Sequence, residues 1–445
     1  WVYNVNDTLQ ISNCDIEDNF ATTSYGDGGG LYLNSTYGYT VTLGDCRLSG
    51  NTAGDKGGAF YINSDVALTL SGGCEISGNS AVNEGGGFWI GTDNTDVTIA
   101  DSLVCGNLPE NIVGEWTPTG STSETIGCGT PTTHVVGTGG DFATVQEAID
   151  ASFPGDTIQV TPGTYTLSAP IDFDGRAITL RGDPADPSLV VLDAQGTEEF
   201  PRRVITFQSG ETADAIIEGV TITGGWADGS GEEGYGGGIY VGQYAGPTIR
   251  NCIIEDNHAD SSGGGVYIKG QGDVETQLLG CTIANNSSAN GAGVWFDGYY
   301  GGSLLLQATD LLQNIASSHG GGLYQSRGAV TITSDPAAPE TRCRIAGNTA
   351  RSGGGIFGYA YSGDTLQISN CDIEDNSSTG TYNGGGLYLN SSYGYTVSLE
   401  SSRVSGNTAE GRGGGFYIYT DVQLTVSNGC EISGNSAVNE GGGFW

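Results

Sequence analysis

The residues that could carry chemistry in this 445-residue chain are paired carboxylates, cysteine thiols, recurrent asparagine amides and aromatic rings. Neighbouring carboxylates occur at three places, namely Glu17 with Asp18, Glu255 with Asp256, and Glu374 with Asp375. Carboxylates and turn carbonyls are the oxygen ligands that Ca²⁺ takes, so these pairs are weak calcium candidates. The alternative is a solvated acidic surface that keeps molecules apart. No EF-hand loop or GGxGxD nonapeptide accompanies the pairs, so no cofactor is required and Ca²⁺ is the one candidate.

The ten cysteines fall into two groups. Most stand at the start of a recurrent phrase, as Cys14, Cys46 and Cys74 do. There we expect either a stack of small buried hydrophobic side chains or disulfides between neighbouring repeats. Cys105 and Cys128 leave that register and bracket a segment rich in Pro, Thr, Ser and Gly. We predict a disulfide between these two, because it would close a loop that has little core.

An internal repeat must position these side chains. The phrase is Cys or a small residue, any residue, Ile, Leu or Val, two residues, and Asn; it is CDIEDN at Cys14 and CRIAGN at Cys343. A glycine cluster with an aromatic or aliphatic pair follows each phrase, as in GGGFW from Gly85. The closing asparagines recur at spacings of 28 to 34 within two runs, which are Asn19, Asn51, Asn79 and Asn107, then Asn257, Asn286, Asn314, Asn348, Asn376, Asn407 and Asn435.

The repeat predicts a parallel β-helix. Apolar residues alternate with a period of two, as in the segment Thr396 to Leu399, and glycine would break helices of this length. Each coil then supplies three short strands, and equivalent positions stack about 4.8 Å apart. The recurrent asparagines are expected to form a ladder in which each side-chain amide bonds to the coils above and below. The predicted fold class is therefore all-β.

The repeat resembles the GGA(I/L/V) and FxxN repeats of polymorphic outer membrane proteins. It is also similar to the wider right-handed parallel β-helix, or pectin-lyase-like, family of secreted bacterial proteins. In this chain GGG mostly stands where that pattern has GGA, as at Gly263 to Gly265. The resemblance implies a right-handed coil and an extracellular or cell-surface location, and its motifs specify the coil and no activity.

The sequence also contains a second repeat, whose period is much longer than one coil. DTLQISNCDIEDN at Asp7 recurs letter for letter at Asp364, and CEISGNSAVNEGGGFW at Cys74 recurs at Cys430. The offset is 357 for the first segment and 356 for the second. The chain thus begins inside one unit and stops inside the next. We expect either one window of a tandem array with a period of 356 or separate chains that stack end to end.

The unit boundary is predicted at residues 133/134. Residues 1–133 would be the C-terminal coils and closing cap of one unit, and 134–445 the opening helix and coils of the next. Val145, Ala148, Ile149 and Ser152 have the spacing of a short amphipathic helix. The stretch resembles the start of many β-helix proteins, pectin methylesterases included, in which such a helix caps the first coil.

Composition narrows the function classes. Lys plus Arg number 14 against 51 Asp plus Glu, so the formal net charge is −37, which excludes a nucleic-acid partner held by basic groups. No apolar run is long enough to span a bilayer. We predict that the chain is not an enzyme, because Lys is confined to Lys56 and Lys269 and the net charge would repel a polyanionic substrate. The three histidines, His134, His258 and His319, are expected to be isolated at the surface.

The sequence favours a structural role, as an extracellular filament, stalk or surface-layer component whose partners are copies of itself. The alternative is an adhesin or passenger-type module that binds surface glycans, and a third class is a polysaccharide-active enzyme. Binding would use a stripe of aromatic residues after the glycine turns, provided that packing within the coil does not occupy them. These residues are Tyr32, Tyr61, Trp89, Tyr240, Tyr267, Trp295, Tyr324, Tyr388, Tyr417 and Trp445.

Overall fold

The computed structural model describes residues 8–23, 25–35, 38–71, 74–92, 96–100, 102–119, 123–125, 132–152, 155–229, 231–361, 363–381 and 383–445. By its contacts the chain divides into two compact bodies. The first comprises residues 1–134, 149–158 and 173–179, and the second comprises 135–148, 159–172 and 180–445. Each body is built of short strands that pair in parallel with strands one coil away.

The first body has four parallel sheets along its sides. One sheet orders β1 (Thr8–Ser12), β5 (Tyr39–Gly44), β9 (Val66–Ser71), β13 (Val97–Ala100) and β16 (Thr117–Thr119). A second orders β2 (Asp15–Glu17), β6 (Arg47–Ser49), β10 (Glu75–Ser77), β14 (Leu103–Cys105) and β17 (Ser123–Thr125). The two shorter sheets are β3 (Phe20–Ala21), β7 (Thr52–Ala53) and β11 (Ser80–Ala81), and β4 (Leu31–Leu33), β8 (Phe60–Ile62), β12 (Phe88–Ile90) and β15 (Ile112–Val113).

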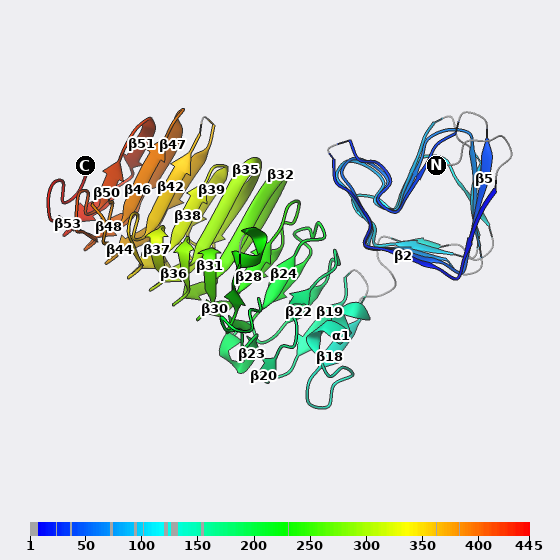
Figure 1. Ribbon diagram of the computed structural model, residues 1–445, viewed down its shortest axis with the longest axis horizontal. Coiled ribbons are helices and arrows are strands. Elements are labelled where there is room, and N and C mark those ends of the chain that lie inside the picture. Colours follow the sequence, from blue (N-terminus) through cyan, green and yellow to red (C-terminus); the bar gives the residue numbers. More distant parts are fainter. Residues whose placement is uncertain are drawn as a thin grey trace. The chain divides into compact units, whose positions relative to one another are not determined.

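The second body repeats this plan over more coils, and its strands follow one another in chain order in Figure 1. The side that carries the recurrent phrase orders β20 (Gly163–Thr166), β23 (Val190–Asp193), β26 (Thr221–Thr223), β30 (Ile253–Glu255), β33 (Thr282–Ala284), β36 (Asp310–Leu312), β40 (Cys343–Ala346), β44 (Cys371–Glu374), β48 (Arg403–Ser405) and β52 (Glu431–Ser433). The next side orders β27 (Trp226–Ala227), β31 (His258–Ser262), β34 (Ser287–Asn290), β37 (Ile315–His319), β41 (Thr349–Ala350), β45 (Ser377–Ser378), β49 (Thr408–Ala409) and β53 (Ser436–Ala437).

The remaining strands of the second body join into one 18-stranded sheet. Its order is β18 (Thr133–Val136), β19 (Thr157–Val160), β21 (Ile171–Asp172), β22 (Thr179–Arg181), β24 (Ile205–Phe207), β25 (Ile216–Glu218), β28 (Ile239–Val241), β29 (Thr248–Arg250), β32 (Val266–Leu279), β35 (Val294–Gln307), β38 (Leu323–Ser326), β39 (Ala329–Thr333), β42 (Ile356–Ala360), β43 (Thr365–Ser369), β46 (Leu387–Ser391), β47 (Tyr395–Glu400), β50 (Phe416–Ile418) and β51 (Val422–Ser427). Two short 3₁₀ segments, Pro187–Leu189 and Gly231–Gly234, lie between strands.

The core follows from alternation along each strand. In β5 the side chains of Tyr39, Val41 and Leu43 are buried, whereas Thr40 between them is exposed. Successive strand residues point to opposite faces, so a period of two sends every other side chain inward. Equivalent inward residues of neighbouring coils then stack in one continuous core.

The glycine cluster makes the turn that leads into each new coil. Gly353 has φ +63°, a conformation that side chains other than glycine rarely adopt. A Cβ atom on Gly354 would lie 2.4 Å from the carbonyl oxygen of Ser377 in the next coil. The second glycine is therefore required because the backbones of adjacent coils approach closely.

One α-helix occurs in the described part of the chain, α1 (Val145–Asp150). Thr144 and Glu147 form a reciprocal capping pair: the Glu147 carboxylate accepts from the Thr144 backbone N–H, and the Thr144 hydroxyl oxygen accepts from that of Glu147. Val145, Ala148 and Ile149 are buried, as their spacing predicts. That this six-residue helix caps a coil stays a prediction, as does the unit boundary at residues 133/134.

Candidate functional site

The structure places the phrase-ending asparagines in two ladders of hydrogen bonds. Asn376 illustrates the pattern: its Nδ2 donates to Asn407 Oδ1 at 2.9 Å and to the Ile345 carbonyl oxygen at 2.7 Å. Its Oδ1 accepts from the backbone N–H and the Nδ2 of Asn348, both at 3.0 Å. Because Asn376 is fully buried, each of these bonds replaces water that the side chain has lost.

The first ladder links Asn19, Asn51, Asn79 and Asn107, and it ends on Asn111. The second ladder links Asn257, Asn286, Asn314, Asn348, Asn376, Asn407 and Asn435. Sequence reasoning missed Asn111, which lies only four residues after Asn107 and so falls outside the coil period.

The residue before each ladder asparagine has a left-handed backbone conformation. Asp18, Asp256 and Asp375 have φ of 53°, 54° and 54°. Glycine, asparagine or glutamine takes the same place in the other coils, again with positive φ, at Gly50, Gly78, Gly106, Asn285, Gln313, Gly347, Gly406 and Gly434. Aspartate tolerates this region better than most residues, so turn geometry alone accounts for these three carboxyl groups.

The structure does not bring the three acidic pairs together. In the second body, Glu255 and Glu374 occupy the same register position, and the residues between them at this position in successive coils are Ala284, Leu312 and Ala346. The two glutamates are thus four coils apart, or about 19 Å at 4.8 Å a coil. The Glu374 carboxylate forms an ion pair at 3.0 Å with Arg344.

In the first body, Glu17 lies 3.6 Å from Arg47 and accepts a hydrogen bond from Ser49. Among the described residues no group of three or more His, Cys, Asp or Glu side chains could hold a metal ion. A calcium site at the acidic pairs therefore gains no support from their placement.

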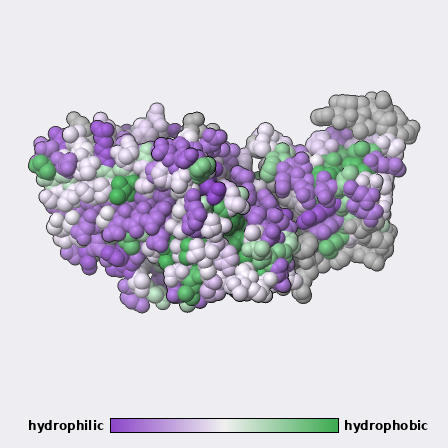
Figure 2. Space-filling model, turned by 60° about the horizontal axis from the view of Figure 1, so that its bottom comes forward, coloured by the Kyte–Doolittle hydropathy of each residue, from purple (hydrophilic) through white to green (hydrophobic). Residues whose placement is uncertain are grey.

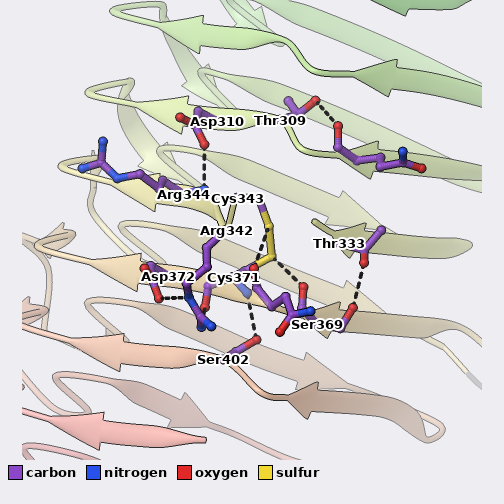
Figure 3. Close-up of a disulfide and its surroundings, with 12 residues drawn as sticks. Thr309, Asp310, Thr333, Arg342, Cys343, Arg344, Ser369, Cys371, Asp372 and Ser402 are labelled. Atoms are coloured by element: carbon purple, nitrogen blue, oxygen red, sulfur yellow. Dashed lines mark hydrogen bonds and ion pairs between the residues drawn. A yellow bond between two sulfur atoms is a disulfide. The ribbon is translucent and has the colours of Figure 1, made fainter. Parts of the chain in front are cut away.

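The cysteines of the recurrent phrase differ in oxidation state: two form a disulfide and others are free thiols. Cys343 of β40 and Cys371 of β44 are register partners and form a disulfide, with Cα atoms 4.7 Å apart. Figure 3 shows this bond beside an ion pair between Arg342 and Asp372, whose atoms lie 2.6 Å apart. Both alternatives that the sequence left open, buried thiols and bonds between coils, thus occur in one ladder.

Other cysteines of the phrase are free thiols, and four of them are buried: Cys46, Cys74, Cys252 and Cys281. Burial raises the pKa of the Cys74 and Cys252 thiols, which keeps them protonated and unreactive. Cys105 is buried, but Cys128 lies outside the described residues, so the bridge between these two stays a prediction.

The aromatic residues after the glycine turns stack ring on ring. In the first body Tyr32, Tyr61 and Trp89 have centroids 5.0 and 4.7 Å apart. In the second body a column runs through Tyr240, Tyr267, Trp295, Tyr324, Phe357, Tyr388, Tyr417 and Trp445. Neighbouring centroids are between 3.9 and 6.4 Å apart.

Four of the eight rings in the second column are buried, and three more are partly buried. Tyr240 and Tyr267 are each 4% exposed, Tyr417 is 1% exposed, and burial raises the pKa of both Tyr240 and Tyr267. The Arg203 guanidinium lies 4.8 Å from the ring of Tyr240 and covers it. Only Trp445, at 38%, is exposed in this column, so the column mainly supplies packing between coils.

A polar cluster that sequence reasoning missed lies where β27 and β31 pair. Trp226 and His258 are register partners whose rings lie 4.0 Å apart. His258 Nε2 is 3.0 Å from Asp260 Oδ1, and its Nδ1 is 2.8 Å from Ser287 Oγ. A hydrogen bond to Asp260 raises the pKa of Asp228, because it favours the protonated form of that carboxyl group.

The register of the coils could have revealed this cluster. Asp228 and Asp260 each stand two residues after one of a pair of register partners, and a period of two places both on the same face. A carboxyl group with a raised pKa, close to a second carboxyl group and an imidazole, can donate and accept protons. The expectation that His258 is isolated is therefore wrong.

The described residues include no helix that is long and apolar enough to cross a membrane. The face of the molecule in Figure 2 is mainly hydrophilic, with small separate hydrophobic patches. Several cationic side chains bridge to an acidic residue in a neighbouring coil, as Lys56 does to Glu84 at 2.9 Å and Arg412 to Glu440 at 3.1 Å. The scarce basic residues thus help to join coils.

Comparison with solved structures found a similarity to pectin methylesterase from carrot. The TM-score is 0.32 and the sequence identity 14%, over 72% of this chain and 84% of that chain. A comparison with the curated proteins found none that matches.

The prediction that the chain is not an enzyme is corrected by this similarity, because the matching structure is an enzyme. At this TM-score the similarity carries no argument for a particular activity. The physical reason for the error is that charge repulsion opposes only polyanionic substrates. The scarcity of Lys does not bear on acid–base groups such as Asp228, Asp260 and His258.

The family described as the right-handed β-helix region matches residues 205–398 and, in a second overlapping match, residues 264–445. The two matches together span more than half of the 445 residues. The prediction of a parallel β-helix is thereby confirmed, and the parallel sheets of both bodies agree with it. This chain belongs to the right-handed β-helix family.

Proposed function

We propose that the chain is a segment of an extracellular structural rod, such as a filament, stalk or surface-layer component, built from repeated β-helix units. The observation that carries this proposal is the recurrence of the same coils at an offset of 356 to 357 residues. In both places the recurring asparagine takes part in a ladder: Asn19 bonds to Asn51, and Asn376 bonds to Asn407.

Cohesion between coils suits such a role. From the coil of Asn257 onward, the coils of the second body contribute backbone hydrogen bonds, ladder asparagines, inward apolar side chains and stacked rings to their neighbours. A solenoid of this kind lengthens by adding coils of about 4.8 Å each, without any new fold. The partners would be copies of the same unit, joined in tandem or stacked end to end, with α1 as the cap of a unit.

An extracellular location is part of the proposal. The disulfide between Cys343 and Cys371 is of a kind that persists in oxidising compartments. The net charge of −37 would keep neighbouring rods apart.

Electron microscopy of native material tests the rod, with a Fab raised against the surface turn AVNE. This turn occurs at residues 81–84 and again at 437–440, and its valines Val82 and Val438 are 58% and 75% exposed. We expect filaments that carry Fab at one constant interval. Compact particles without filaments, or filaments labelled at random intervals, would contradict the proposal.

A glycan-binding adhesin is the second candidate. The aromatic stripe considered for it is stacked and largely covered in the second body, so that stripe does not favour sugar binding there. A sugar would need another surface with a free ring face.

A further inference from the structure

A row of outward side chains crosses the side of the second body that contains β27, β31, β34 and β37. Trp226, His258, Ser287 and Ile315 are register partners in four successive coils. The residue that follows each of them in its strand, such as Ala259, is buried, so the row itself faces outward. Equivalent positions stack about 4.8 Å apart, which places His258 between an indole ring and a serine hydroxyl.

His258 joins this serine to a carboxylate. Its Nδ1 lies 2.8 Å from Ser287 Oγ, and its Nε2 lies 3.0 Å from Asp260 Oδ1. A carboxylate oxygen only accepts hydrogen bonds, so Asp260 places the imidazole proton on Nε2. Nδ1 is then free to accept the hydrogen bond that the serine hydroxyl donates. A hydroxyl, an imidazole and a carboxylate linked in this order are the groups that activate a serine nucleophile.

The neighbouring carboxyl group supports this role of Asp260. The hydrogen bond between Asp228 and Asp260 raises the pKa of Asp228, and the negative charges of Asp260 and Glu198 raise it further. The first proton that the pair takes up therefore goes to Asp228. Asp260 is left as the carboxylate that stabilises an imidazolium when His258 accepts a proton.

The surroundings of Ser287 restrict the group that could react with it. Ile315, its register partner on the side away from His258, is 59% exposed and offers an apolar surface to an acyl chain. The carboxyl groups beside His258, together with the net charge of −37, oppose an anionic reagent. Ser287 is only partly buried, so a small molecule can reach its hydroxyl. A neutral donor with a short apolar acyl chain meets these conditions.

The same row contains a second serine without this arrangement. Ser377 has Thr349 and Thr408 as its register partners, and Thr349 in turn follows Ile315. Like Ser287, it is partly exposed. The coil thus accepts threonine where His258 stands beside Ser287, so stacking alone does not explain the linked serine, histidine and aspartate.

We propose that Ser287 is an activated nucleophile that accepts a short apolar acyl group from a neutral aryl ester or thioester, with His258 as the general base. As the serine oxygen bonds to the acyl carbon, its proton passes to His258 Nδ1. The bond from the acyl carbon to the leaving oxygen or sulfur then breaks, and His258 returns the proton to that leaving group. The products are acyl-Ser287 and a phenol or thiol. Asp260 is a positioning residue, because it acts through His258.

A fluorophosphonate probe and p-nitrophenyl butyrate, each incubated with the purified full chain, test the proposal. Mass spectrometry should find the phosphonyl or butyryl group on Ser287, and the butyrate should release a stoichiometric burst of p-nitrophenol. Ser287→Ala should lose this labelling, and His258→Gln should slow it about a hundredfold, which is the lower end of what a general base contributes. Asp260→Asn should lower the maximal labelling rate severalfold without changing the probe concentration that gives half of that rate, and Asp260→Glu should recover part of the rate.

Ser377 is the matched control, because it has the same register position and no histidine partner in the register. It should stay unlabelled in the unmodified chain, and Ser377→Ala should leave the labelling rate of Ser287 unchanged. The mono-p-nitrophenyl ester of succinic acid, which carries a carboxylate, should react more slowly than the butyrate. Circular dichroism should show the same fold in all variants. Equal labelling of the two serines, no adduct on Ser287, an unchanged rate in His258→Gln, or faster reaction of the succinate ester would overturn the proposal.

Discussion

The two copies of the same coils, residues 8–89 and 365–445, differ in burial although their sequences agree over long stretches. Ile373 is fully buried, whereas its counterpart Ile16 is partly exposed. Asn376 is likewise fully buried, and its counterpart Asn19 is exposed. Within the described residues the coil of Ile373 has a neighbour on each side, and the coil of Ile16 has one on a single side.

The difference reverses at the other end of the copies. Phe88 is fully buried beneath Ile112, while its counterpart Phe444 is 44% exposed. Identical residues are therefore buried where another coil stacks on them and exposed where none does. In a solenoid the free energy of folding is approximately a sum of the intrinsic stability of each repeat and the interfaces between neighbouring repeats. Because the two copies share their sequence, a difference in stability between them measures the contribution of the interfaces.

The largest difference between the copies is expected for the ladder. Asn376→Ala removes bonds to Asn407 and Ile345 and leaves the donors of Asn348 unsatisfied, so it should cost about 4 kcal/mol of local stability. Asn19→Ala should cost less than about 1 kcal/mol, because water reaches that side chain. Hydrogen-exchange mass spectrometry of peptides covering each site measures both losses. Equal losses would show that neighbouring coils do not set the cost.

The apolar core should show a somewhat smaller contrast. Ile373→Ala leaves a cavity in a closed core and is expected to destabilise its coil by about 3 kcal/mol. Ile16→Ala should cost about 1 kcal/mol, since part of that side chain is already in water. The same exchange measurement compares them. A larger loss of stability at Ile16 than at Ile373 would contradict the view that neighbouring coils set the cost.

The disulfide offers a third contrast. Cys371 is bonded to Cys343 across a sequence separation of 28, whereas its counterpart Cys14 is an exposed free thiol. Cys371→Ser should lower stability by about 2 to 3 kcal/mol, and Cys14→Ser should have almost no effect. Thermal unfolding with and without reductant measures the difference. Alkylation of the native, non-reduced chain should label Cys14 readily, and labelling of Cys343 would contradict the bond.

The smallest contrast concerns a pair of ions at the glycine turn, Lys56 with Glu84 in the first copy and Arg412 with Glu440 in the second. Hydrogen bonds from Lys56 and Trp89 lower the pKa of Glu84 below its ordinary 4.5. The ionised form is thus favoured on folding. Its small stabilising effect is present above pH 4.5 and disappears as the pH falls through the lowered pKa.

Carboxyl carbon NMR should therefore find the Glu84 midpoint below 4.5, and Lys56→Gln should raise it. Arg412→Gln is the control, because it removes the equivalent cation in the other copy and should leave the Glu84 midpoint unchanged. A midpoint of 4.5 or higher in the unmodified chain would show that the ion pair does not form in solution.

What the sequence could predict is what repeats. The period of the phrase predicts the coil and the place of each ladder asparagine, because every coil must satisfy the same stacking geometry. The period does not predict that Cys343 and Cys371 form a disulfide while Cys252 and Cys281 stay free, because both pairs have the same position in neighbouring coils. The cover that Arg203 gives to Tyr240 depends on loops of irregular length, which no periodicity describes.

The candidate site was harder to predict for the same reason. The cluster of Asp228, Asp260 and His258 forms only when two coils are aligned in register, which no single phrase of the repeat describes. Charge arguments about one class of substrate were too narrow to exclude catalysis.

The left-handed turn before each ladder asparagine determines how the negative charge along the axis can vary from coil to coil. The same backbone site holds aspartate at Asp375 and glycine at Gly406, one coil later, with nearly equal φ. Replacing Asp375 by glycine would remove one charge and keep the backbone conformation that Gly406 already has. A side chain at Gly406 would instead displace the Asp375 carboxylate, because a Cβ there would lie 2.3 Å from Asp375 Oδ1. The negative charge along the axis can therefore be lowered in single steps without a change of fold, whereas raising it requires carboxyl groups of neighbouring coils to move apart.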